Sequence, residues 1–232
     1  MKQKLLESVA AGREREAELA ALCVDAPADA NGRWSAKDHL AHLSWWRVRD
    51  AGLFDAVRTG GELPPSVEDD AQNAVVYAEN RDRTVAEIKK DATESWEVLR
   101  AAVEALSQAD LTRPHPYAPQ VNLAVTVTNI TYFHVGQHLM FWYLERGDQA
   151  RAEAAQVWVR DMEEATFSDP RRHATAAYNL GCFYARVGRA DVAVPLLRAG
   201  FEGRPDLAEL ARTDPDLDPI RQDPAVKELL AT

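Results

Sequence analysis

The sequence predicts an all-α protein, with a four-helix bundle over residues 1–147 and a short helical segment over residues 151–232. Apolar residues recur at steps of three and four along most of the chain, as they do on the buried face of a helix. The segments between these runs are rich in proline, glycine and acidic residues, which is typical of connections between helices. After Gly147 alanine and arginine become more frequent, and this change of composition predicts the boundary between the two parts.

The first two helices are predicted from periodicity and from their ends. The first covers about residues 4–22 and stops before Ala26-Pro27, because the residue before a proline disfavours helical backbone angles. The second covers residues 35–57. Ser35 and Asp38 have the spacing of a capping box, in which each side chain binds a backbone N–H group of the first turn.

The third helix has the clearest pattern and begins at Thr84, which forms a second capping-box pair with Glu87. One buried stripe follows, and it comprises Val85, Ile88, Ala92, Trp96, Leu99, Val103 and Leu106. Residues 59–82, between the second and third helices, are interpreted as a long crossover link. Its acidic run, Glu68-Asp69-Asp70, is interpreted as a solvated loop, with guidance of a cationic substrate as the alternative.

The fourth helix is less obvious, because the β-branched residues at 121–133 would also suit a strand. A helix is favoured because five residues fall on one helical face: Val127, Ile130, His134, His138 and Phe141. Gly147 is a helix stop signal. The preceding link, residues 107–120, contains three prolines and is predicted to be a loop over one end of the bundle.

The tail is predicted to be helical as well. Its first apolar stripe comprises Ala155, Trp158, Met162 and Ala165, and an Asp169-Pro170 break follows. Five later residues have the spacing of a tetratricopeptide unit, which this segment resembles: Leu180, Gly181, Tyr184, Ala193 and Pro205. About three such units are normally needed for stability. We therefore expect the tail to pack on the bundle, or to form a homodimer or bind a protein partner.

Charge and hydropathy exclude several classes of partner. The formal net charge of −10 disfavours binding to nucleic acid and to anionic membrane surfaces. No apolar run has the length of a signal peptide or of a membrane span, so a soluble, cytoplasmic protein is expected. Cys23 and Cys182 are too few for a disulfide framework and are expected to be buried, reduced thiols.

Three histidines form a candidate metal site. His134 and His138 are four residues apart on one helical face, and His42 lies in the middle of the second helix. Three imidazoles from two helices could hold a divalent ion, Zn²⁺ or Ni²⁺, with their nitrogens about 3 to 4 Å apart, and leave coordination positions open for water or substrate. The alternative is that they are core histidines bonded to neighbouring hydroxyl groups.

The segments WSAKDHLAHLSWW, YAENRDRTVAEIKKD and FHVGQHLMFWYLERGD resemble the DinB superfamily, in its DfsB-like branch, which includes colibactin self-resistance. The resemblance covers residues 1–147 and rests on Trp34, on the triplet 41–43 and on the late histidine pair. It implies His42, His134 and His138 as metal ligands. His39 falls outside the pattern and is expected to face solvent or to cap the helix.

This resemblance implies a metal-dependent hydrolase or thiol transferase that acts on a small electrophilic molecule, in detoxification or toxin self-resistance. Its cofactors would be a divalent ion and a low-molecular-weight thiol, although the self-resistance members open a cyclopropane ring and leave metal dependence open. The aromatic residues near the histidines are candidates to bind the substrate, with a role as core or rim residues as the alternative: Trp45, Trp46, Tyr132, Trp142 and Tyr143. The alternative function is a non-catalytic module that sequesters a ligand or binds a protein.

Overall fold

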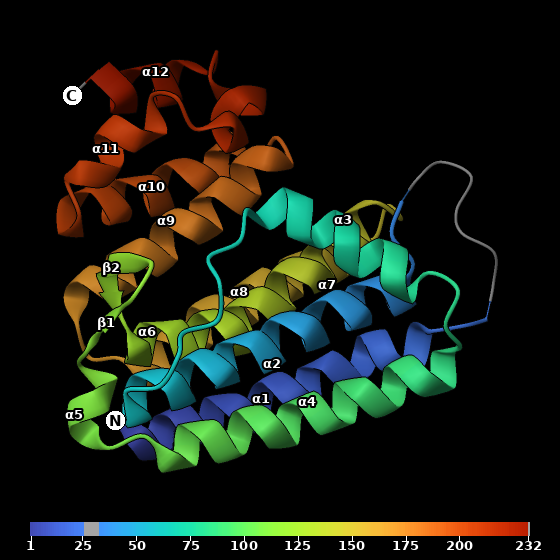
Figure 1. The fold of residues 1–232 in the computed structure, drawn as a ribbon. Helices are drawn as coiled ribbons and strands as arrows, with labels where there is room; N and C mark the ends of the chain where they lie inside the picture. Colours follow the sequence, from blue (N-terminus) through green and yellow to red (C-terminus); the bar gives the residue numbers. More distant parts are fainter. Residues whose placement is uncertain (26–32, 232) are drawn as a thin grey trace. The chain divides into compact units, whose positions relative to one another are not determined.

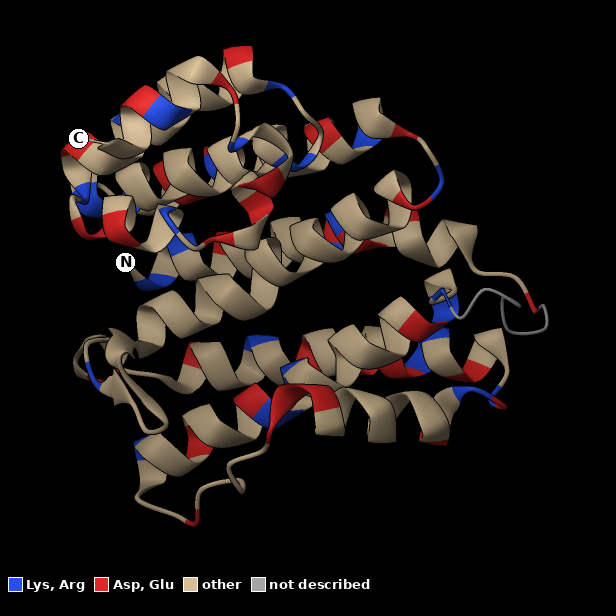
Figure 2. Ribbon diagram, turned by 90° about the horizontal axis from the view of Figure 1, so that it is seen from above, with Lys and Arg blue, Asp and Glu red and all other residues tan. Residues whose placement is uncertain are grey.

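The computed structural model describes residues 1–25 and 33–231, and nearly all of its regular structure is α-helical (Figure 1). The predicted all-α fold class is confirmed. The chain divides into two compact units, Met1–Arg146 and Gly147–Thr232, each with its own internal packing. Lysine and arginine are interspersed with aspartate and glutamate along the helices of both units (Figure 2).

The first unit contains four long helical stretches. Three are continuous helices, α1 (Lys2–Leu22), α2 (Ala36–Thr59) and α4 (Val85–Ala105), which pack against one another side by side in Figure 1. The fourth consists of α6 (Leu123–Thr128), a π-helical turn η1 (Asn129–Phe133) and α7 (His134–Leu144). α1 packs against all three parts of this stretch.

Both predicted capping boxes are present. The Ser35 hydroxyl accepts a hydrogen bond from the Asp38 backbone N–H, and Thr84 makes the same contact with Glu87. At the other end of α2, Gly60 ends the helix with φ of 73°, a left-handed conformation that glycine adopts at little cost. These contacts fix where α2 begins and ends, and α2 carries one side of the candidate site.

The core of the bundle surrounds a buried ion pair that joins three helices. Arg47 of α2 donates to Glu16 of α1 (Nη2 to Oε1, 2.9 Å) and to Ser95 of α4 (Nε to Oγ, 3.0 Å). Trp96 Nε1 also donates to Glu16 Oε1, at 2.9 Å. Because Arg47 and Glu16 are both buried, removal of either partner would leave a charge in the core.

The two links of the bundle contain structure that the sequence analysis missed. Residues 59–82 are not simply a link, because α3 (Asp69–Asn80) occupies their second half. Glu68 caps α3 by accepting from the backbone N–H groups of Asp70 and Ala71. In residues 107–120, the predicted loop is replaced by α5 (Gln108–Leu111) and an antiparallel pair, β1 (Pro114–His115) and β2 (Ala118–Asn122).

The predicted fourth helix is present but begins later and changes its winding. Residue 121 belongs to β2, and the Asn122 side chain caps α6 by accepting from the Val125 backbone N–H. The π turn then places one extra residue in the winding ahead of α7. Val127 and Ile130 are buried as predicted, and Phe141, although 37% exposed, lies on the same side of the helix as His134 and His138, with which it lines a pocket.

The second unit contains α8 (Gln149–Thr166), α9 (Pro170–Arg186), α10 (Ala190–Gly203), α11 (Asp206–Ala211), the 3₁₀ turn η2 (Pro215–Ile220) and α12 (Pro224–Ala231). α9 packs against α8, α10 and η2, and α10 also packs against α11 and α12. The predicted break is a helix start, at which Asp169 caps α9 and Pro170 is its first residue. Pro205 follows directly after Arg204, the C-cap residue of α10, and it precedes the first residue of α11.

The α9–α10 hairpin is antiparallel, and glycines permit its close approach. A Cβ atom added at Gly181 would lie 3.0 Å from the Leu197 side chain, and one added at Gly200 would lie 3.0 Å from Tyr178. Residues near the start of α9 therefore lie opposite residues near the end of α10, as an antiparallel arrangement requires. Leu197 fills the space that the missing side chain of Gly181 leaves between the helices.

Two expectations about the chain as a whole can be compared with the structure. Cys23 and Cys182 are both buried and are not in a disulfide, as expected. Among the helices of residues 1–25 and 33–231, none combines the length and the apolar character that a membrane crossing requires.

Candidate metal centre

Three histidines converge inside the first unit, His42 from α2 and His134 and His138 from α7. One candidate ligand nitrogen from each lies within 4.8 Å of the other two. The Nε2 atoms of His42 and His134 are 2.9 Å apart. The residues expected to converge therefore do so, within a limit slightly wider than the predicted 3 to 4 Å.

Local structure explains why these side chains meet. The Ser35 capping box starts α2 two turns before His42. The π turn at Asn129–Phe133 ends directly before His134, so it sets the direction in which the first turn of α7 points. The four-residue spacing then places His138 above His134 on the same helix face.

Burial keeps the imidazoles neutral. Burial, and to a smaller extent the charge of Arg47, lower the pKa of His42 to about 4. The pKa values of His134 and His138 also lie well below the ordinary value, mainly because of burial and then because of the neighbouring histidines. Neutral imidazole is the form that binds metal ions.

The spacing of these nitrogens is compatible with a shared divalent ion. Two imidazole nitrogens that are each about 2.0–2.1 Å from one ion are about 3.3 Å apart at the tetrahedral angle of zinc and about 2.9 Å apart at right angles. The Nε2 atoms of His42 and His134 are 2.9 Å apart, which is the separation of ligands at right angles. Imidazole suits Zn²⁺, Ni²⁺, Cu²⁺ and Fe²⁺, so the donor set fits a transition metal rather than Mg²⁺ or Ca²⁺.

A pocket of about 460 Å³ opens beside the three histidines and has the size of small-molecule sites. Its walls combine aromatic rings, amides and two carboxylates with the imidazoles. The lining residues are Trp34, His42, Trp46, Asp50, Asp69, Asn73, Asn129, Ile130, Phe133, His134, Gln137, His138 and Phe141. An ion held by the histidines would therefore be next to a space that a substrate can enter.

Of the four aromatic residues predicted to bind the substrate, Trp45, Trp46, Tyr132 and Trp142, only Trp46 lines this pocket. Its Nε1 donates to Asn73 Oδ1 at 3.1 Å. Tyr132 is fully buried and is not a lining residue. Trp142 is not a lining residue either: its ring centre is 6.0 Å from that of His39, and the Arg146 guanidinium lies 3.1 Å from its ring centre. Tyr143 points toward α1, where its hydroxyl donates to Glu18 Oε2 at 3.1 Å.

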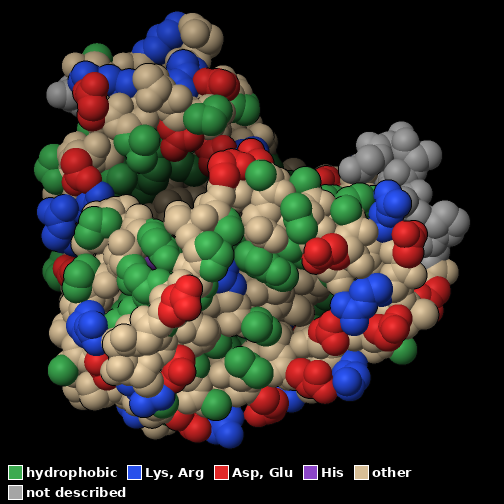
Figure 3. All heavy atoms as spheres, in the orientation of Figure 1, with side chains coloured by type: hydrophobic (Ala, Val, Ile, Leu, Met, Phe, Trp, Pro, Cys, Tyr) green, Lys and Arg blue, Asp and Glu red, His purple; other side chains and the backbone are tan. Residues whose placement is uncertain are grey.

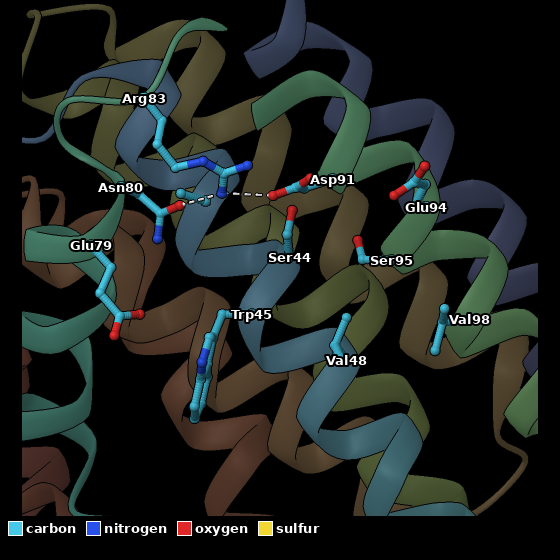
Figure 4. A pocket seen from close by; sticks show the side chains of 11 residues that line it. Ser44, Trp45, Val48, Glu79, Asn80, Arg83, Asp91, Glu94, Ser95 and Val98 are labelled. Carbon is cyan, nitrogen blue, oxygen red and sulfur yellow. Dashed lines mark hydrogen bonds and ion pairs between the residues drawn. The ribbon is translucent and has the colours of Figure 1, made fainter. Parts of the chain in front are cut away.

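Trp45 faces a different pocket, of about 430 Å³, which involves α2, α4 and the end of α3 (Figure 4). Arg83 crosses this pocket and binds both Asp91 (2.7 Å) and Asn80 (2.8 Å). Trp45 and Trp46 are adjacent in sequence and point about 100° apart around the helix, so they cannot both face the histidines.

His39 was wrongly expected to face solvent or cap the helix. It is only 4% exposed, and its Nδ1 lies 2.6 Å from His138 Nδ1. Burial lowers its pKa to about 3. The centre of the Trp34 ring lies 5.5 Å from that of His39 and 5.1 Å from that of His42. The cluster therefore contains four imidazoles, of which three can share an ion.

Several lining residues were not predicted. Trp46 and Asp50 follow His42 at steps of four residues, a spacing that places them on its face of α2 and could have identified Asp50. Asn73 was missed because α3 was missed. Burial raises the pKa of Asp50 to about 6, although the ion pair with Arg49 opposes this shift.

On the face of the molecule in Figure 3, hydrophobic and charged side chains are interspersed and almost no histidine surface is visible. The sequence profile of the DinB superfamily matches residues 11–141, which is more than half of the chain and spans from α1 to α7. No curated protein and no solved structure matches the chain.

Proposed function

Because the chain belongs to the DinB superfamily, we propose that it is a metal-dependent enzyme of the hydrolase or thiol-transferase type that acts on a small electrophilic molecule. The observation that carries this proposal is the set of three neutral histidines, one buried and two partly buried, in the wall of a pocket of small-molecule size. A site with three protein ligands leaves coordination positions open, which is typical of catalytic metal sites.

His42, His134 and His138 would hold the ion, for which we propose Zn²⁺ or Ni²⁺. When bound, such an ion lowers the pKa of a water molecule or of a low-molecular-weight thiol and so supplies a nucleophile near neutral pH. The burial of the three imidazoles supports this role, because it keeps them unprotonated and available as ligands.

The remaining pocket residues would bind the substrate and manage its proton. Trp34, Trp46 and Phe141 offer apolar walls, and the amides of Asn73, Asn129 and Gln137 can orient polar groups by hydrogen bonds. Asp50 is our candidate for the general acid, because its pKa of about 6 lets it hold a proton near neutral pH in the same pocket.

The biological role that we propose is detoxification or toxin self-resistance, as the resemblance to the DfsB-like branch suggests. The tetratricopeptide-like tail would then serve as a surface for a protein partner or a second copy of the chain. These two proposals go beyond the metal site, and either can be wrong while the metal proposal remains correct.

Metal analysis of protein purified without a histidine tag tests the proposal. We expect about one ion per chain in the wild type and in His115→Ala, a control outside the cluster, and little metal in His138→Ala. Turnover of electrophilic substrates, with and without a thiol, should stop with a chelator and return with added ion. Metal-free wild type would favour ligand sequestration, and chelator-insensitive turnover would favour metal-free ring opening.

A further inference from the structure

We infer that His39 is a positioning residue for the metal centre: its Nδ1 accepts a hydrogen bond from His138 Nδ1–H and thereby directs His138 Nε2 toward the ion. This inference rests on the proposed function, because it assigns His39 a role toward the same ion. It concerns a residue that belongs neither to the group of three ligands nor to the pocket lining.

The contact between the rings of His39 and His138 determines which nitrogen of His138 is free to bind a metal ion. His39 Nδ1 and His138 Nδ1 are 2.6 Å apart, so one nitrogen donates a proton and the other accepts it. If His138 donates, its Nε2 keeps a lone pair for a metal ion. If His39 donated, a neutral His138 would carry its proton on Nε2 and could not bind the ion through that atom.

The directions of the two side chains leave Nε2 of His138 on the side of the pocket. His138 lines the pocket, and its Nδ1 is the atom turned toward His39, which leaves Nε2 for the pocket side. His39 is buried on α2, one turn before His42. The ring of Trp34 packs near His39 on one side and is nearly parallel to His138, with an interplanar angle of 14°.

The fold holds His39 in a position where its Nδ1 can accept a hydrogen bond from His138 Nδ1–H. Asp38 and Ser35, the residues of the capping box, fix the first turn of α2, to which His39 belongs. Its other nitrogen, Nε2, is buried and has no hydrogen-bond partner among the described residues. The Nδ1 contact is thus the polar interaction that orients this ring.

Hydrogen bonds to the non-ligating nitrogen of a metal-bound histidine fix its tautomer and increase its basicity. Loss of such a partner typically weakens metal binding by about 10- to 100-fold. This range sets the effect that substitution of His39 should have.

Two variants of the full-length protein, His39→Asn and His39→Leu, test whether His39 positions His138 through a hydrogen bond or only fills space. Asparagine places its amide oxygen close to the position of Nδ1 and can accept from His138, whereas leucine fills the volume without an acceptor. We expect His39→Leu to bind Co²⁺ about 10- to 100-fold more weakly than the wild type, and His39→Asn to bind within a few-fold of it. Titration followed by the visible absorption of Co²⁺ provides the affinity.

The shape of the Co²⁺ spectrum distinguishes a positioning residue from a ligand. We expect the absorption bands of His39→Asn to coincide with those of the wild type, because the ligand set is unchanged. Shifted bands in His39→Asn, unchanged affinity in His39→Leu, or an Asn variant as weak as the Leu variant would each overturn the inference.

A measurement on the unaltered protein keeps the test valid if His39→Leu does not fold. In ¹⁵N-histidine NMR of the metal-free wild type, His138 should carry its proton on Nδ1, and an Nε2–H tautomer would overturn the inference. The two proposals can also fail separately. A wild type that does not bind Co²⁺ or Zn²⁺ contradicts the proposed function, whereas normal binding by His39→Leu contradicts only the role of His39.

Discussion

His39, His42, His134 and His138 lose their hydration together when the first unit folds, and burial is the main reason that all four pKa values are lowered. In the unfolded chain each imidazole has a pKa near 6.5. Below that pH the unfolded state binds protons that the native cluster does not accept. The histidines therefore tie the stability of the metal-free protein to pH.

We predict that metal-free protein loses stability steeply as the pH falls from 6.5 to 4. The contribution of the histidines is fully present above pH 6.5, because the unfolded chain is then neutral at these positions too. Each histidine can remove up to about 1.4 kcal/mol per pH unit in this window. Urea denaturation at pH 7.5, 6.5, 5.5 and 4.5 measures the slope.

Two comparisons sharpen this test. Asp50 acts in the opposite direction, because its raised pKa makes its contribution disappear as the pH rises through about 6. It offsets part of the effect of one histidine. The His39→Asn variant should have a shallower slope than the wild type, and identical slopes in the two proteins would show that His39 is not kept neutral by the fold.

The metal ligands could be predicted at this scale, but their surroundings could not. A spacing of four residues fixes the relative direction of His134 and His138, whatever packs around them. The role of His39 depends on which side of α2 faces α7, and no local pattern determines that. The prediction that Trp45 and Tyr132 line the site was wrong for the same reason. Closeness to a histidine in sequence does not determine the direction in which a side chain points.

At the scale of single helices, Gly12 of α1 controls how closely three elements approach. A Cβ atom at Gly12 would lie 2.8 Å from Trp96 Cη2 and 3.4 Å from the Thr131 backbone carbonyl carbon. Trp96 cannot move away easily, because its Nε1 is bonded to Glu16 and the Arg47 guanidinium lies 4.1 Å from its ring centre. Glycine lowers the stability of the helix itself at this position, but it allows α1 to pack closely against Trp96 and Thr131.

We predict that Gly12→Ala lowers the free energy of unfolding by up to about 2 kcal/mol. Overpacking costs about 1–3 kcal/mol, whereas alanine gains only about 1 kcal/mol in helix propensity. The matched control is Gly52→Ala in α2, where the nearest atom, Pro64 Cγ, is 3.9 Å from the added Cβ. That variant should be more stable by about 0.5–1 kcal/mol.

Chemical denaturation of both variants measures these differences. Equal stabilisation by the two substitutions would mean that Trp96 and Thr131 adapt without cost, contrary to the prediction. The metal content of Gly52→Ala should remain that of the wild type, because Gly52 lies on the exposed side of α2.

The elements that could be predicted are those with a wide apolar stripe. α1, α2 and α4 have such stripes, and the ends of α2 and α4 are marked by capping boxes. α3 is short and has Val76 as its buried residue, so it was not distinguished from the proline- and glycine-containing link that precedes it. The hairpin at 114–122 is short and rich in proline, and its pairing depends on contacts that the sequence pattern does not contain.

At the scale of the whole molecule, the second unit has a core of its own. The sequence suggested that a single repeat-like hairpin needs cover from the Trp158 stripe and from the bundle or a second copy of the chain. The helix that carries Trp158, α8, does pack against α9, and further cover comes from within the second unit, where η2 packs against α9 and α11 and α12 pack against α10. Leu217 of η2 and Val226 of α12 are fully buried, although neither was part of the predicted unit.

We therefore predict that a fragment of residues 147–232 folds by itself as a monomer. It should show helical circular dichroism and one cooperative thermal transition, and sedimentation should give the mass of one chain. A fragment that is unfolded or self-associates would contradict this prediction and restore the expectation from sequence. Residues 1–146, expressed separately, should retain the metal content of the whole protein.

The π turn between α6 and α7 also bears on how this chain is compared with its relatives. A π turn holds one residue more than the α-helical turn it replaces, so it has the same effect as a single-residue insertion. A relative whose fourth helix winds without interruption should be one residue shorter between the positions of Asn122 and His134. An alignment without a gap there would pair His134 and His138 with the wrong residues, and the shared ligands would go unrecognised.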